Sequence, residues 1–308
     1  MMLRMKKSHI LLFLLLSLVL AGCLHLEKTE YAKPESQHVE SAPQYSTAES
    51  KNITIASFNI QIFGKAKISN PEIMNILSRI IRKYDVVAIQ EVRSEEQNVI
   101  PALLKYANDS NAKYDYVISE RLGRTGSKEQ YAFVYNTKTV SLIPNSSYVI
   151  NDPNDVFERE PFVAYFRSRN FDFKIVNNHI KPEDADAELR QLAVVINNIY
   201  DSSTEKDVIV LGDMNADGTY FNENKLAAIL PLWRQLIGND KDTTIAVSDN
   251  TYDRMMTRDT TANVEYNGTS GVFRWDSEYG VADANFIKKV SDHYPIYAEF
   301  RTNLPDDD

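Results

Sequence analysis

Residues 208–215 read Val-Ile-Val-Leu-Gly-Asp-Met-Asn, an apolar, β-branched run that polar residues follow at once. Similar runs recur along the chain, and helical spacing of apolar residues predicts helices over residues 70–83 and 185–200. The runs that we expect to be strands cover residues 53–60, 86–89, 131–135, 162–166, 173–177, 208–211 and 296–300. The chain is therefore expected to have an α/β fold.

Five short blocks place polar side chains just after or before such runs. They are Phe58-Asn59, Gln90-Glu91-Val92-Arg93, Gly212-Asp213-Met214-Asn215, Tyr252-Asp253 and Ser291-Asp292-His293-Tyr294-Pro295. A strand end holds a charged side chain rigidly, and several such ends can converge on one carboxylate-rich pocket for a divalent cation and a phosphate. The blocks therefore indicate a metal-dependent phosphodiesterase.

Histidine is scarce in this chain. Three of the five histidines, His9, His25 and His38, precede the first predicted strand, so His179 and His293 are left for the folded domain. Hydrolysis of a phosphodiester requires an activated water and a proton for the departing alkoxide. A lone histidine on an apolar segment is more often structural than catalytic, and both readings stay open at this level.

The blocks and their order resemble the deoxyribonuclease I family of the endonuclease/exonuclease/phosphatase superfamily, from about Ile53 to Phe300. The resemblance extends to Leu122-Gly123-Arg124, Lys128-Glu129, Arg159-Glu160-Pro161 and Asp242-Thr243-Thr244. It implies a four-layer α/β sandwich, in which helices flank two packed mixed β-sheets. It also implies a metal-dependent endonuclease that hydrolyses DNA with low sequence specificity and leaves 5'-phosphate and 3'-hydroxyl ends.

The resemblance pairs each histidine of the domain with an acid, His179 with Glu129 and His293 with Asp253. A carboxylate behind an imidazole fixes its tautomer and stabilises the imidazolium, so the two pairs can supply one general base and one general acid. We expect His293 to activate water and His179 to protonate the 3' leaving oxygen. The residues alone leave the reverse assignment open.

The active-site cation is expected to be Mg²⁺ or Mn²⁺, because a hard divalent cation prefers oxygen donors. The resemblance implies Glu91, Asn59 and Asp292 as its ligands. Asp213 and Asn215 would help to hold phosphate, water or a second ion. An Asp-x-Asn sequence is also common in simple turns, which is the alternative reading of these two residues.

Two structural Ca²⁺ sites are implied in the same way. The first would use Asp242 and Thr244. The ligands of the second would be Asp152, Asp155, Phe157 through its carbonyl, and Glu160. Calcium accepts six to eight flexible oxygen ligands, which suits such loops, although an acidic solvated loop is the simpler alternative.

Substrate contacts are expected from Arg93, Arg159 and Tyr252. A guanidinium offers forked donors to phosphate oxygens, although a solvated surface arginine is the alternative reading of Arg93 and Arg159. Gln61 and Ser127 stand where the family has a DNA-contacting arginine and tyrosine. The whole chain has a formal net charge of −9, and it would carry about −12 without residues 1–22. Binding to DNA is therefore expected to be weak and sensitive to salt.

The first residues resemble a lipoprotein signal. Arg4, Lys6 and Lys7 precede an apolar run over residues 10–20, and Leu20-Ala21-Gly22-Cys23 follows. A run of eleven residues is too short to span a bilayer core about 30 Å thick, and an ordinary signal peptide is the alternative. We expect an exported protein, either secreted or anchored outside a prokaryotic cell through a lipid on Cys23.

The predicted organisation has four parts: a signal peptide over residues 1–22, a disordered tether over 23–50, a catalytic domain over 51–303 and an acidic tail over 304–308. Because Cys23 is the only cysteine, no internal disulfide can form. We expect a monomer that binds DNA and does not bind actin. Two alternatives remain, a phosphodiesterase of the same superfamily acting on sphingomyelin or a phosphoinositide, and a non-catalytic surface binding module.

Overall fold

The computed structural model describes residues 51–109, 111–126, 128–258 and 262–306. The chain divides into two units, Met1–Thr47 and Ala48–Asp308, and every described residue belongs to the second. The predicted signal peptide, the tether with Cys23, and Ser127 lie outside the described residues, so those expectations stay predictions.

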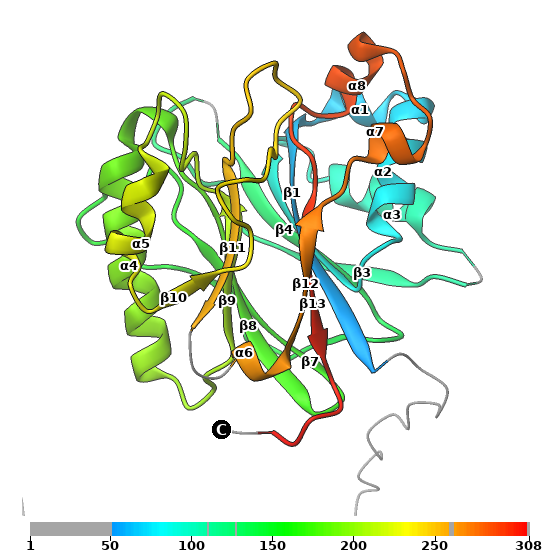
Figure 1. The fold of residues 1–308 in the computed structure, drawn as a ribbon. Coiled ribbons are helices and arrows are strands. Elements are labelled where there is room, and N and C mark those ends of the chain that lie inside the picture. Colours follow the sequence, from blue (N-terminus) through cyan, green and yellow to red (C-terminus); the bar gives the residue numbers. More distant parts are fainter. Residues whose placement is uncertain (1–50, 110, 127, 259–261, 307–308) are drawn as a thin grey trace, which may run out of the picture. The chain divides into compact units, whose positions relative to one another are not determined.

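The strands of the described unit form two sheets (Figure 1). The order in the first sheet is β12 (Tyr266–Val272), β13 (Ile296–Arg301), β1 (Asn52–Phe63), β2 (Val86–Val92), β4 (Gln130–Asn136) and β3 (Tyr114–Ile118). The order in the second sheet is β10 (Trp233–Gln235), β11 (Asp253–Arg258), β9 (Val208–Asp213), β8 (Phe171–His179), β7 (Phe162–Ser168) and β5 (Ser141–Leu142), and β6 (Tyr148–Val149) also pairs with β7. Because β1 and β2 are parallel, as are β8 and β9, while their neighbours are antiparallel, both sheets are mixed.

Helices cover the outer face of each sheet (Figure 1). The first sheet is covered by α1 (Lys65–Ile68), α2 (Pro71–Ile81), α3 (Val99–Ala107), α7 (Trp275–Glu278) and α8 (Ala284–Val290). The second sheet is covered by α4 (Ala185–Ser202) and α5 (Leu226–Ile229). Short segments complete the fold: α6 (Ala262–Glu265) and the 3-10 turns η1 (Pro182–Asp184) and η2 (Glu223–Lys225). The predicted four-layer α/β sandwich is confirmed.

Three apolar cores hold the layers together. The middle core fills the space between the sheets and includes stacked or edge-on rings of Phe133, Phe162, Phe166 and Phe173. The two outer cores lie between each sheet and its helices. Two strands, β2 and β9, are buried at every position. A strand that is buried on both faces needs apolar side chains on both.

Each predicted strand and both predicted helices are present, with ends that differ by a few residues. Asn70 caps α2 by accepting hydrogen bonds from the backbone N–H groups of Glu72 and Ile73, and Pro71 occupies its first turn. None of the helices in the described part of the chain has the length and hydrophobicity needed to cross a bilayer.

Candidate active site

One edge of the sandwich collects the functional side chains from both sheets. Asn59 and Glu91 lie near the carboxyl ends of the parallel strands β1 and β2, and His179 and Asp213 end the parallel strands β8 and β9. Antiparallel strands begin at the same edge, so Glu129 precedes β4, Asp253 begins β11 and His293 precedes β13. Seven segments that are separate in the sequence thereby meet in one place.

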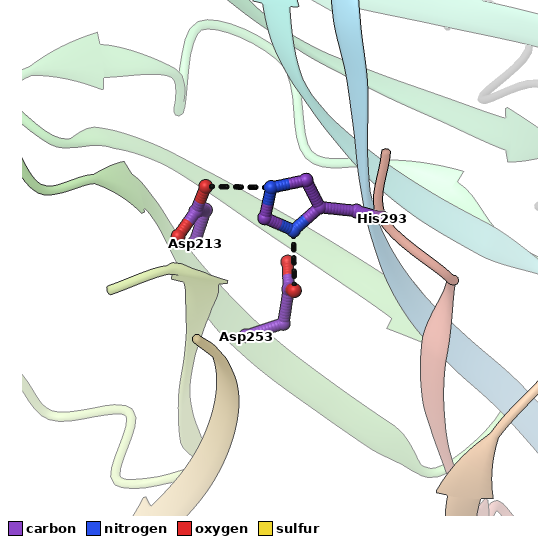
Figure 2. A group of neighbouring side chains, drawn as sticks. All are labelled: Asp213, Asp253 and His293. Carbon is purple, nitrogen blue, oxygen red and sulfur yellow. Dashed lines mark hydrogen bonds and ion pairs between the residues drawn. The ribbon is translucent and has the colours of Figure 1, made fainter. Parts of the chain in front are cut away.

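His293 lies between two aspartates (Figure 2). Its Nδ1 atom is 2.7 Å from Asp253 Oδ2, and its Nε2 atom is 3.4 Å from Asp213 Oδ2. One ligand atom from each of these three buried residues lies within 4.8 Å of the others, so the group could also hold a metal ion. Both ring nitrogens face carboxylates, which is the arrangement of a supported acid or base.

His179 forms a second pair of the same kind. Its Nδ1 atom is 2.9 Å from Glu129 Oε2, and its Nε2 atom is 3.6 Å from Asp213 Oδ2. Glu129 Oε1 accepts hydrogen bonds from Arg93 at 2.8 Å and from Arg159 at 3.1 Å. The carboxylate behind His179 is thus held in place from two sides.

Charge at this edge favours protonated imidazoles. Burial acts to lower the pKa of His293, but the charges of Asp253 and Asp213 outweigh it, and the pKa lies well above its usual 6.5. Burial also acts to lower the pKa of His179, but the charge and hydrogen bond of Glu129, together with the charge of Asp213, outweigh it and raise the pKa. Burial acts to raise the pKa of Glu129, while the charges of His179, Arg159 and Arg93 bring it down to about 2. Both imidazoles can therefore carry a proton near neutral pH.

Asp213 faces both imidazoles and is held by its own neighbours. Oδ2 accepts a hydrogen bond from Asn59 Nδ2 at 2.9 Å, and Oδ1 accepts one from the Asn215 backbone N–H at 3.1 Å. Burial acts to raise the pKa of Asp213, but the charges of His293 and His179 lower it below its usual value. Asn215 has a φ of +45° and donates from Nδ2 to the Ile180 carbonyl, so the Asp-x-Asn segment is a turn that also places Asp213.

The expected cation ligands lie beside this centre. Asn59 Nδ2 is 3.2 Å from Glu91 Oε1, and Asn59 Oδ1 is buried without a hydrogen-bond partner among the described residues. Burial raises the pKa of Asp292, and the charges of Glu91 and Asp213 raise it further, as expected for neighbouring carboxylates. An unpartnered amide oxygen among carboxylates is a donor set that suits a hard cation.

Two neighbouring segments of the site have a strained backbone. Glu91 and Ile62 both have positive φ values, +61° and +49°, which non-glycine residues rarely adopt. In this conformation the Ile62 backbone N–H donates to Glu91 Oε2 at 2.8 Å, and Arg93 Nη2 lies 2.9 Å from the same oxygen. These two contacts offset the strain, and they fix the Glu91 carboxylate at the edge of the site.

Several supporting residues were not predicted from the sequence. Gln90 Nε2 donates to Asn177 Oδ1 at 2.6 Å and joins the two sheets beneath the site. Tyr131 accepts the backbone N–H of His179 on its hydroxyl. Lys67 is buried and donates to the carbonyls of Ile60 and Val290, and burial lowers its pKa to about 8. A lysine in a four-residue helix carries no sequence signal for burial.

The residues expected to contact DNA lie at the same edge, in different surroundings. Arg93 is partly exposed and bridges Glu91 and Glu129. Arg159 is buried, with its guanidinium on Glu129 and the His179 carbonyl. Tyr252 is partly exposed, and its ring centroid lies 6.4 Å from that of His293. Gln61 donates to Asp292 Oδ2 at 2.7 Å.

At the first expected calcium site, the Asp242 carboxylate already has hydrogen-bond partners. Asp242 Oδ1 accepts hydrogen bonds from the Thr244 backbone and hydroxyl, and Asp242 Oδ2 is 3.0 Å from Arg274 Nη1. These contacts satisfy both carboxylate oxygens of Asp242 without a cation.

The second expected site has a free donor. Asp152 Oδ2 accepts the Phe157 backbone N–H at 2.8 Å, whereas Asp152 Oδ1 is buried without a partner among the described residues. Asp155 lies in the same loop with a φ of +49°, and its carbonyl accepts from Arg124. For Glu160, half-buried at the end of this loop, the described residues provide no side-chain hydrogen bond. The open oxygen of Asp152 favours this loop over the first as a cation site.

Comparison with known proteins gives matches over most of the chain. Residues 56–293 match the Endonuclease/Exonuclease/phosphatase family. The chain is 34% identical to Deoxyribonuclease-1 of Bos taurus over 257 residues, which covers 80% of this chain and 91% of that protein. It is also 34% identical to Deoxyribonuclease gamma of Rattus norvegicus over 261 residues, covering 80% and 83%.

Solved structures show the same fold at low sequence identity. An endonuclease/exonuclease/phosphatase family protein from Leptotrichia buccalis superposes with a TM-score of 0.59 at 16% identity, covering 81% of this chain and 99% of that one. The catalytic domain of human Nocturnin superposes with a TM-score of 0.56 at 14% identity, covering 81% and 93%. At these identities the likeness supports the fold and nothing finer.

Proposed function

Because the chain belongs to the endonuclease/exonuclease/phosphatase family, in its deoxyribonuclease I-like branch, and is a nuclease, we propose that it is a metal-dependent endonuclease acting on DNA. It would hydrolyse phosphodiester bonds with low sequence specificity and leave 5'-phosphate and 3'-hydroxyl ends. The similarity to deoxyribonucleases over most of the chain supports DNA as the substrate.

One observation carries the proposal: two carboxylate-supported histidines face the same carboxylate. The Nε2 atoms of His179 and His293 lie 3.6 Å and 3.4 Å from Asp213 Oδ2. A phosphate seated at this point would have one imidazole available to the attacking water and the other to the leaving oxygen. A surface protein that only binds a ligand has no physical need for two such pairs.

In the proposed reaction His293, supported by Asp253, is neutral and takes a proton from water on Nε2; a bound cation would favour this neutral form by offsetting the negative charges of the surrounding carboxylates. The water oxygen forms a bond to phosphorus and the bond from phosphorus to the 3' oxygen breaks. His179, supported by Glu129, gives its Nε2 proton to the departing 3' oxygen. Asp213 orients both imidazoles, and Asn215 holds the turn that places Asp213.

Glu91, Asn59 and Asp292 would hold the cation, which we propose to be Mg²⁺ or Mn²⁺. The unpartnered buried oxygen of Asn59 and the neighbouring carboxylates support this assignment. A bound cation would supply charge stabilisation for the phosphorane oxygens. The other residues of the site bind, orient and move protons without further cofactors.

Arg93, Arg159 and Tyr252 remain the proposed contacts to phosphate or to the minor groove. Arg93 and Tyr252 are partly exposed at the rim of the site, which supports a direct contact. Arg159 is buried against Glu129, so its charge would act on the substrate from beneath the surface.

We further propose the predicted organisation: a lipoprotein signal over residues 1–22, a tether over 23–50, the catalytic domain over 51–303 and an acidic tail. The basic residues, the apolar run and the Leu20-Ala21-Gly22-Cys23 sequence support export and a lipid on Cys23. The protein would act as a monomer on DNA outside the cell, with Ca²⁺ as a structural ion.

Nicking of supercoiled plasmid by the purified protein tests this function. Wild type should nick DNA with Mg²⁺ and Ca²⁺ present and fail with a chelator, and His179→Ala and His293→Ala should each lose most activity. His38→Ala, in the predicted tether, is the matched control and should behave as wild type. Hydrolysis of sphingomyelin or a phosphoinositide with no action on DNA would contradict the substrate, and inertness toward all three would favour a binding module.

A further inference from the structure

A cavity of about 320 Å³ opens next to His293. Its lining includes Thr244, Ile245, Tyr252, Lys288, Asp292 and His293. Its volume falls at the lower end of the range of about 300–1,000 Å³ that is usual for small-ligand pockets. Since His293 and Asp292 belong to both the cavity and the proposed catalytic centre, any group bound here would lie beside the reacting phosphate.

Backbone contacts join the walls of the cavity to the segment that contains Asp292 and His293. The Ile245 backbone N–H donates to the Asp292 carbonyl at 2.8 Å, and Thr244 pairs with His293 in an isolated β-bridge. Tyr252 packs between Tyr220 and His293, at ring-centroid distances of 5.4 Å and 6.4 Å. The cavity therefore has an apolar and aromatic wall whose position is tied to the catalytic histidine.

The cavity also has a cation that differs from the others near the site. Arg93 and Arg159 are paired with carboxylates, and Lys67 is buried on two carbonyls. Lys288, in contrast, is exposed in α8 and forms no ion pair with any described residue. In a chain of net charge −9, an unpaired lysine at the rim of a carboxylate-rich site is suited to a phosphate.

We propose that this cavity is a subsite for the nucleotide next to the scissile phosphate. Lys288 contacts the phosphate of that nucleotide, while Tyr252 and Ile245 contact its sugar. Contacts to phosphate and sugar carry no information about the base, which agrees with an enzyme of low sequence specificity. The inference rests on the proposed function, because it takes a DNA strand as the occupant.

Steady-state nicking at several salt concentrations tests the subsite. Lys288→Ala should raise KM about 3- to 10-fold and leave kcat within about twofold, since a contact to a remote phosphate is made equally in the ground state and the transition state. The slope of log KM against log salt should fall by about 1, because one phosphate contact is lost. Lys288→Arg should restore both quantities.

Two further variants separate the contribution of the Lys288 charge from that of the apolar contacts in the cavity. Lys289→Ala is the matched control, because Lys289 is exposed on the same helix but is not among the described residues lining the cavity. Ile245→Ala should raise KM without changing the salt slope, since it removes an apolar contact and no charge.

The outcomes distinguish the two proposals. If wild type nicks DNA but Lys288→Ala matches Lys289→Ala in KM and salt slope, the subsite is wrong and the proposed function stands. A fall in kcat alone for Lys288→Ala would also overturn the subsite, because it would place Lys288 in the chemical step. A wild type that leaves DNA intact would overturn both proposals.

Discussion

His179 and Asp213 occupy paired positions at the carboxyl ends of the parallel strands β8 and β9, with Nε2 of one 3.6 Å from Oδ2 of the other. On its other side β9 pairs with β11, where Asp253 lies opposite Asp213. Asp253 in turn supports His293. Three adjacent strands thus place a histidine, the shared carboxylate and the partner of the second histidine side by side. The relative position of these strands sets the spacing of both proposed proton-transfer groups.

Gly212 is required for this strand pairing. Its φ is +143°, and a Cβ atom built on it would lie 1.9 Å from the Asn178 carbonyl oxygen. Gly212→Ala should therefore destabilise the fold by about 2–5 kcal/mol, because both the strained backbone and the contact with β8 must give way. Denaturant unfolding measures this loss. Gly126→Ala, where nothing lies within 4 Å of the added atom, should stay within about 0.5 kcal/mol of wild type, and equal stability of the two variants would contradict the argument.

The pH profile of Glu129→Gln should reveal the role of His179. The Glu129 carboxylate raises the pKa of His179 against the effect of burial, so its removal lowers that pKa. An acid must be protonated to act, and the alkaline limb of the rate profile should consequently move to lower pH. Movement of the acid limb instead would make His179 the base. Asp186→Asn, at an exposed carboxylate in α4, should leave both limbs in place.

Asp253→Asn is the complementary experiment. Asp253 raises the pKa of His293, and loss of its charge should lower that pKa. If His293 is the base, it will be neutral over a wider range and the acid limb should move to lower pH while the maximal rate falls. Rates measured from acid to alkaline pH at saturating Mg²⁺ test this, and an unmoved acid limb would rule out His293 as the group that limits activity in acid.

Glu91→Gln should weaken the response to the active-site cation. Mutation of a residue that only orients a metal ligand typically lowers the affinity for the metal by about 10- to 100-fold. Loss of a direct ligand should lower it by at least as much. Titration of Mn²⁺ binding measures the effect without reference to activity. Glu95→Gln, at an exposed carboxylate just after β2, is the control, and unchanged Mn²⁺ affinity in Glu91→Gln would remove Glu91 from the metal site.

Calcium should raise the thermal stability of the wild type through the loop of Asp152. A ligand at about 100 times its Kd stabilises the native state by about 2.7 kcal/mol. Asp152→Asn should lose most of this gain, because the unpartnered Oδ1 atom is the open donor of that loop. Melting curves with and without Ca²⁺ decide the matter. Asp201→Asn serves as the exposed control, and a full calcium response in Asp152→Asn would place the ion elsewhere.

Local sequence pattern was sufficient for the strands with apolar, β-branched residues and for the two long amphipathic helices. It did not predict β3, β5, β6, β10, β12 or β11. In β11, the residues Asp253, Arg254 and Thr257 are polar and yet fully buried. Arg254 can be buried because Asn239, Gln235 and the Ala216 carbonyl accept its hydrogen bonds, and burial lowers its pKa to about 10. Those acceptors come from distant segments, and a pattern of hydropathy carries no information about them.

The sequence by itself determined the family, the fold class and the residue types at the candidate site, because strand periodicity and ordered motifs are local properties of the chain. Only the tertiary structure decided which groups meet. It placed Asp213 between the two imidazoles, put Arg93 and Arg159 on Glu129, buried Lys67 and left Lys288 exposed beside the cavity. These relationships depend on packing two sheets against each other, and burial and charge pairing arise only once distant segments are in contact.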